Sequence, residues 1–74
     1  MTPDVLNLAN EAARTSTNLG APVLTATSSR EDLIRWLAWN DRNGCYTDSD
    51  CAAEGMDPLT TREAWDLVAS AVEV

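Results

Sequence analysis

Three segments of this 74-residue chain each combine a helix-start signature with apolar residues spaced three and four positions apart. The signatures are Thr2-Pro3-Asp4, Ser28-Ser29-Arg30-Glu31-Asp32 and Thr60-Thr61-Arg62-Glu63. A Ser or Thr N-cap, a Pro at N1 and acids in the first turn all stabilise a helix start. Apolar residues at this spacing form the stripe that a helix buries. The sequence therefore predicts an all-α fold, a small bundle of three main helices.

The first helix is predicted to end at about Arg14 or Ser16, with Gly20 as the C′ residue that follows it. Residues 21–27 contain β-branched side chains, but no second segment offers a partner strand. Because a lone strand is not stable, we expect this stretch to be an extended connector between the first two helices.

The connection between the second and third main helices is predicted to hold a short extra helix. The second main helix should end near Trp39 or Asn40, and Asn43-Gly44 should form a turn, in which the glycine is free to take a positive φ. The polar run at 47–50 is typical of a helix cap, so we expect a short helix over 48–54 that ends at the next glycine.

The chain is expected to form one domain over residues 1–74. A chain of this length hides only about 60% of the surface that its unfolded form exposes, which leaves little room for a deep active site beside a core. The expected core residues lie on the apolar faces of the three main helices: Leu8, Ala12, Leu33, Ile34, Trp36, Leu37, Trp65, Leu67, Val68 and Val72.

All of the net charge lies in residues 31–74. Residues 1–30 contain two acids and two arginines, whereas residues 31–74 contain ten acids and three arginines, which accounts for the formal charge of −7. Such a surface repels nucleic acid and anionic membranes and attracts basic protein surfaces. The sequence also lacks a secretory signal and a membrane-spanning apolar run, so the expected location is the cytoplasm.

Catalysis and cofactor binding are not expected. The chain has no histidine, and no nucleophile lies beside an evident base. Cys45 and Cys51 are too few ligands for a closed zinc site, and in a cytosolic protein they are expected to be free thiols. A calcium loop with Gly44 at its sixth position would place Trp39 at the first, where a carboxylate is needed, so that alternative is a degenerate site.

The stretch Trp36-Leu37-Ala38-Trp39-Asn40-Asp41-Arg42-Asn43-Gly44-Cys45-Tyr46-Thr47-Asp48, with Glu54-Gly55-Met56-Asp57-Pro58-Leu59-Thr60 and Glu63-Ala64 after it, resembles a segment of small phage and mobile-element proteins. The short, acidic, lysine-free chain as a whole resembles the anti-CRISPR inhibitors. This resemblance implies that the chain binds a CRISPR effector, often a type I surveillance complex, inside a bacterial host cell. It also implies that the chain prevents the effector from binding target DNA.

A physical mechanism accompanies that resemblance, because carboxylates on a rigid surface can occupy an Arg/Lys channel that evolved for phosphates. The alternatives are an antitoxin-like protein that masks a small basic toxin, a degenerate calcium-binding domain, and a phage structural part. Several of the acids also have an ordinary explanation, since acids at helix starts favour the helix dipole. The expected partner-binding residues are Asp41, Asp48, Asp50, Glu54 and Asp57, supported by Glu31, Asp32, Glu63 and Asp66, with Trp39 or Tyr46 as the aromatic anchor.

Overall fold

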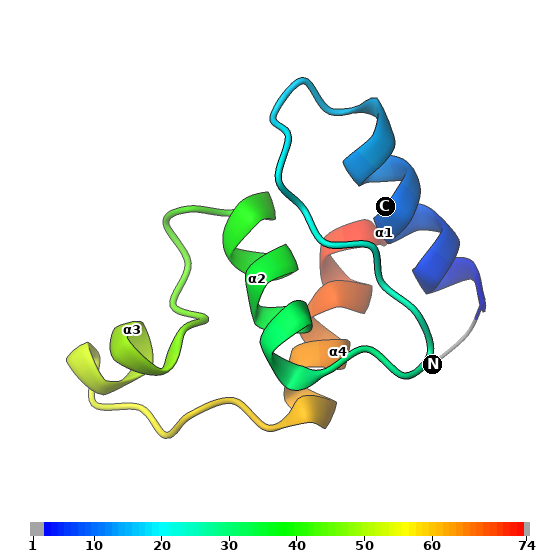
Figure 1. The fold of residues 1–74 in the computed structure, drawn as a ribbon. Coiled ribbons are helices and arrows are strands. Elements are labelled where there is room, and N and C mark those ends of the chain that lie inside the picture. Colours follow the sequence, from blue (N-terminus) through cyan, green and yellow to red (C-terminus); the bar gives the residue numbers. More distant parts are fainter. Residues whose placement is uncertain (1–2, 74) are drawn as a thin grey trace.

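The computed structural model describes residues 3–73, and this part of the chain contains four α-helices and no strand (Figure 1). The all-α prediction is confirmed, including the short extra helix between the second and third main helices. The helices are α1 (Pro3–Thr15), α2 (Arg30–Asn40), α3 (Asp48–Ala53) and α4 (Thr61–Val72).

Side-chain caps fix the starts of α2, α3 and α4. The hydroxyl oxygens of Ser29, Thr47 and Thr60 each accept a hydrogen bond from the backbone amide three residues later. At α4 the Glu63 carboxylate also accepts from the Thr60 amide, at 3.0 Å, which completes a capping box. These bonds satisfy amides that a helix start leaves without an intrahelical partner. The predicted cap of α1, Thr2, lies outside the described residues.

The core forms where α4 packs against both α1 and α2. Trp36 is fully buried at its centre, and its indole N–H donates to the Ala9 carbonyl oxygen at 3.3 Å. The side chain of Ala9 is small, so the large indole can approach the α1 backbone. The buried cluster consists of Ala9, Leu24, Leu33, Trp36, Leu37, Ala64 and Val68.

The predicted core is correct for α2 and only partly correct for the other helices. Leu8 is 44% exposed, because the buried face of α1 is centred on its neighbour Ala9 rather than on Leu8. Four other predicted core residues are only half-buried: Ala12, Trp65, Leu67 and Val72.

The Asn10 side chain holds the part of the α1–α2 connector around Leu24. The Asn10 amide nitrogen donates to the Leu24 carbonyl oxygen at 2.9 Å, and its side-chain oxygen accepts from the Leu24 amide at 2.8 Å. This pair of bonds replaces the partner strand that the connector lacks. It fixes the backbone of Leu24, whose side chain is buried in the core although the sequence analysis left it out.

The glycine predictions have mixed outcomes. Gly55 follows the C-cap residue Glu54 of α3 with a φ of +70°, as the predicted end of that helix requires. Gly20 also has a positive φ, of +120°, but α1 ends at Thr15, so its prediction as the C′ residue of that helix is wrong.

None of the helices within residues 3–73 is long and apolar enough to cross a membrane.

Candidate functional site

Residues 41–57, which we call the acidic arm, extend to one side of the body formed by α1, α2 and α4 (Figure 1). Within the described residues, the helix of this arm, α3, makes no helix–helix contact of the kind that joins α4 to α1 and α2. Arg42 is the one cation in this part of the sequence. Five carboxylates of the predicted site belong to the arm, and all five are exposed: Asp41, Asp48, Asp50, Glu54 and Asp57.

Arg30, in the first turn of α2, connects the arm to the body. Its Nε donates to the Leu59 carbonyl oxygen, and its Nη2 donates to Asp48 Oδ1 at the start of α3. The hydrogen bond to Asp48 is the main reason why the pKa of Arg30 is raised. Arg30 therefore links the start of α2 to the start of α3 and to the segment that returns from the arm to α4.

Asp41 and Tyr46 stabilise the turn that joins α2 to the arm. One Asp41 carboxylate oxygen accepts from the Asn43 amide at 3.0 Å, and the other accepts from the Tyr46 hydroxyl at 3.3 Å. Burial raises the pKa of Tyr46, and the charge of Asp41 raises it further. Asp41 therefore stabilises the turn at 41–46 as well as adding charge to the surface.

Gly44 does not use the positive φ that is open to a glycine in this turn. The residue is a glycine for a different reason. A Cβ atom at this position would collide with the ring of Tyr46 and would lie 2.7 Å from its hydroxyl oxygen. Any residue with a side chain at this position requires the ring of Tyr46 to move.

Asp50, Glu54 and Asp57 are the arm acids that remain without a salt bridge or a hydrogen bond to their carboxylates within residues 3–73. The charges of Glu54 and Asp50 both raise the pKa of the Cys45 thiol, after its burial, which is the largest cause. Two of these three carboxylates therefore act on the same neighbouring group. Asp50, Glu54 and Asp57 form the part of the arm's predicted surface whose carboxylates the fold does not use.

The supporting acids lie on the body and are partly engaged in the fold. Glu31 and Asp66 are exposed, whereas Asp32 pairs with Arg35 at 3.5 Å and Glu63 closes the capping box of α4. The Thr60 backbone amide, followed by the Thr60 side chain, lowers the pKa of Glu63. Because α2 and α4 start at the same end of the body (Figure 1), the acids of their first turns share that end.

Trp39 packs on the body rather than on the arm. Its indole N–H donates to the Asn18 carbonyl oxygen at 2.7 Å, and its ring centroid lies 5.8 Å from that of Trp36. Tyr46, in contrast, lies in the arm and is half-buried. Of the two predicted anchors, only Tyr46 is adjacent to the arm carboxylates.

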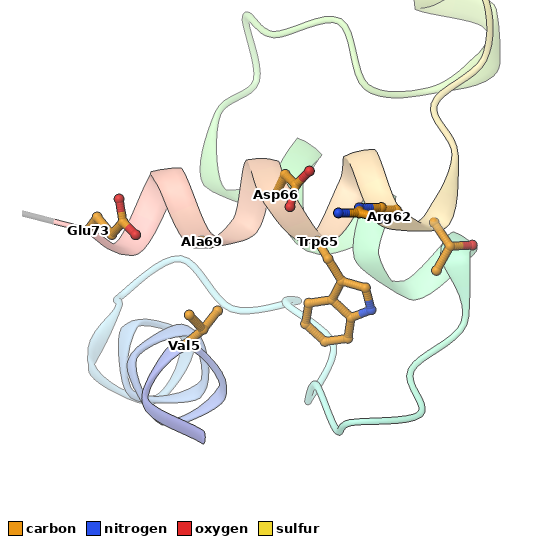
Figure 2. Close-up of a pocket in the computed structure, with 7 residues that line it drawn as sticks. Val5, Arg62, Trp65, Asp66, Ala69 and Glu73 are labelled. Carbon is orange, nitrogen blue, oxygen red and sulfur yellow. The ribbon is translucent and has the colours of Figure 1, made fainter. Parts of the chain in front are cut away.

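A groove between α1 and α4 is the feature that the sequence analysis missed. It has a volume of about 700 Å³, and Figure 2 shows the indole of Trp65 extending into it, with Val5 on the opposite wall. Asp66 and Glu73 lie along its α4 side. The sequence placed Trp65 in the core, yet its position beside the apolar stripe of the last helix was a sign that the ring could lie at the edge.

No family model, curated protein or solved structure matches this chain.

The carboxylates do not gather into a metal centre in the part of the chain that the structure describes, where no group of three or more Asp, Glu, His or Cys side chains is arranged to hold an ion. Asp41, the third-position ligand of the hypothetical calcium loop, uses both of its oxygens for hydrogen bonds inside the turn. The chemistry that this arrangement supports best is electrostatic binding by an exposed acidic surface.

Proposed function

We propose that this chain is a non-enzymatic inhibitor that binds a basic, nucleic-acid-handling protein complex through the acidic arm. The supporting observation is that Asp50, Glu54 and Asp57 are exposed, carry no partner within residues 3–73, and belong to a segment that extends beside the body (Figure 1). An Arg/Lys channel that binds phosphates offers complementary charges to such a surface.

The arm carries hydrogen bonds that restrict its conformation before it meets a partner. The Thr47 cap, the bond between Tyr46 and Asp41, and the link from Arg30 to Asp48 act on its two sides. A pre-organised segment loses less conformational freedom on binding than a flexible acidic tail does. Opposite charges accelerate association, and buried aromatic contacts slow dissociation, so Tyr46 is the proposed anchor.

The proposed partner is a type I CRISPR surveillance complex, whose access to target DNA the arm would block. This assignment rests on the resemblance to anti-CRISPR inhibitors and on the small, acidic character of the chain. Such a complex must bind the phosphate backbone of its target, and it therefore has the kind of basic channel that the arm fits.

The test measures binding of the chain to a purified type I surveillance complex, with and without target DNA. The double substitution Glu54→Lys and Asp57→Lys reverses two exposed charges that the fold does not use. We expect it to weaken binding roughly 10- to 100-fold, which corresponds to about 1.4–2.8 kcal/mol. We also expect target DNA to compete with the wild-type chain, and added salt to release it.

The matched control reverses two exposed acids of the body, Glu11→Lys on α1 and Glu73→Lys at the end of α4, which changes the net charge by the same amount. It should weaken binding far less, because these residues lie on the body and not on the arm. Circular dichroism should show that both variants keep the wild-type helix content. Equal losses in the two variants, or no binding by the wild-type chain, would refute the proposal.

A further inference from the structure

The two cysteines lie close together within the arm, one before and one inside α3. The Cys51 thiol is fully buried and donates to the Cys45 carbonyl oxygen, with a distance of 3.8 Å from Sγ to oxygen. Cys45 is half-buried, precedes the Thr47 cap by two residues, and is a free thiol like Cys51. The proposed function uses neither side chain.

We propose that Cys45 and Cys51 are a dithiol pair that a peroxide converts into an intramolecular disulfide, which closes the turn around the start of α3. A carbonyl oxygen lies about 2.4 Å from its own Cα atom, so Cys51 Sγ lies within roughly 6 Å of the Cys45 Cα atom. Adding the Cα–Sγ span of about 2.8 Å bounds the distance between the two Cα atoms at roughly 9 Å. A disulfide holds its two Cα atoms about 4.4–6.8 Å apart, so closure requires both side chains to rotate and the backbone to bring the two positions within that range.

An oxidant can reach Cys45 through an open pocket. This pocket has a volume of about 390 Å³, and Cys45 lines it together with Tyr46, Met56, Leu59 and Leu67. Cys51 is buried, so it is suited to the second step, in which it attacks an already oxidised neighbour.

The two steps balance with hydrogen peroxide as the oxidant. The Cys45 thiolate attacks one peroxide oxygen, the O–O bond breaks, and a sulfenic acid and hydroxide form. The Cys51 sulfur then attacks the Cys45 sulfur, the S–O bond breaks, and the released hydroxide takes up the Cys51 proton as water. Both thiols are oxidised to the disulfide, and one peroxide is reduced to two waters. A dithiol reductant reverses the change by thiol–disulfide exchange.

The surroundings make Cys45 a slow thiol rather than a fast redox sensor. Burial raises the pKa of Cys45, and the charges of Glu54 and Asp50 raise it further. Glu63 and Asp66 add negative charge at the wall of the same pocket. Because the thiolate is the attacking species, we expect oxidation to need excess peroxide and to be slower than that of an ordinary exposed cysteine.

The test treats the full chain with hydrogen peroxide, alkylates the remaining thiols and measures the mass. We expect the loss of two hydrogen atoms and of both alkylation sites, with full recovery after treatment with dithiothreitol. Cleavage on the N-terminal side of Asp48 or Asp50 separates the two cysteines in the sequence. The resulting fragments should stay joined until they are reduced. The Cys45→Ser variant, which keeps the buried Cys51, should show no such mass loss.

A short loop can also close in an unfolded chain, so a second measurement tests the native geometry. The equilibrium constant for disulfide formation against glutathione should be at least about tenfold larger in the native chain than in concentrated urea. An equal or smaller native value would overturn the proposal. So would disulfide-linked dimers as the only product, or stepwise gain of oxygen on both cysteines without a cross-link. None of these results depends on whether the arm binds a partner.

Discussion

The three-helix body and the acidic arm are stabilised by different interactions. The body buries Trp36, Leu33 and Leu37 of α2 against Ala64 and Val68 of α4. The arm is stabilised by caps, by hydrogen bonds and by the link from Arg30, and Cys51 is the one buried side chain of α3. Burial of apolar surface contributes about 25 cal/mol per Å², whereas a single net hydrogen bond contributes about 0.5–1.5 kcal/mol.

This difference shows how a small domain can present charge without weakening its core. The arm acids repel one another, but they lie on a segment whose conformation is set by local polar contacts. Regions with few buried apolar contacts open at lower free energy than the core. We therefore expect the arm to open, and to respond to substitution, independently of the body.

Removal of the central core side chain should have the largest effect. The Trp36→Ala substitution deletes a fully buried indole and its bond to the Ala9 carbonyl oxygen. Truncations of this kind cost about 3–5 kcal/mol, which is comparable to the whole stability of a small domain. The midpoint of urea denaturation, followed by circular dichroism, should fall sharply or the variant should be unfolded in buffer.

The control is Leu19→Ala, because Leu19 is 83% exposed. Its free energy of unfolding should change by less than about 0.5 kcal/mol. A Trp36→Ala variant with the midpoint of the wild-type chain would show that the body is not organised around this residue.

The helix starts were predictable because a cap is a local signal. Thr60 and Glu63 lie three residues apart and form a complete capping box, and Ser29 and Thr47 cap α2 and α3 as their sequences indicate. The end of the short helix at Gly55 was equally local. These features depend on contacts within one turn, which the order of residues specifies directly.

The errors concern contacts between residues far apart in the chain. Leu24 is buried because Asn10, 14 positions earlier, holds its backbone, and no local pattern shows that pairing. Gly44 is favoured by the ring of Tyr46, which a Cβ atom would displace, rather than by its own φ. The sequence identifies every acid of the arm. Only the structure separates Asp50, Glu54 and Asp57, whose carboxylates have no partner within residues 3–73, from acids engaged in the fold.

Within the arm, Gly44→Ala should have a moderate and local effect. The new methyl group would displace the ring of Tyr46 and remove its hydrogen bond to Asp41. Overpacking typically costs about 1–3 kcal/mol, and we expect the lower end because the ring is only half-buried. Hydrogen exchange should increase over the arm and remain unchanged in α4.

Tyr46 is the only tyrosine in the chain, so tyrosinate absorbance reports on this site alone. Burial and the charge of Asp41 raise its pKa in the folded chain. The stability that this shift contributes is present below the ordinary tyrosine pKa and is lost as the pH rises through the folded value. In Gly44→Ala the titration should move toward the ordinary value. The control Asn43→Ala should leave it in place, and an unchanged titration in both variants would contradict the packing described for the turn.

The smallest predicted effect is at Glu63, in the capping box of α4. The Thr60 backbone amide and side chain lower the pKa of this carboxylate, so its contribution is present above the ordinary glutamate pKa and is lost as the pH falls through the folded value. Glu63→Gln should therefore lower the thermal midpoint slightly at neutral pH, and the difference from the wild type should shrink in acid. A constant difference at every pH would contradict this assignment.

Glu73→Gln is the matched control, since it removes an acid from the opposite end of the same helix. The helix dipole disfavours negative charge there, so this substitution should not lower the midpoint at neutral pH. A loss at Glu63 alone would show that this carboxylate stabilises the helix start through the capping box. Glu54 and Asp57, whose carboxylates have no partner within residues 3–73, carry no such role, so their substitution should leave the same thermal midpoint nearly unchanged.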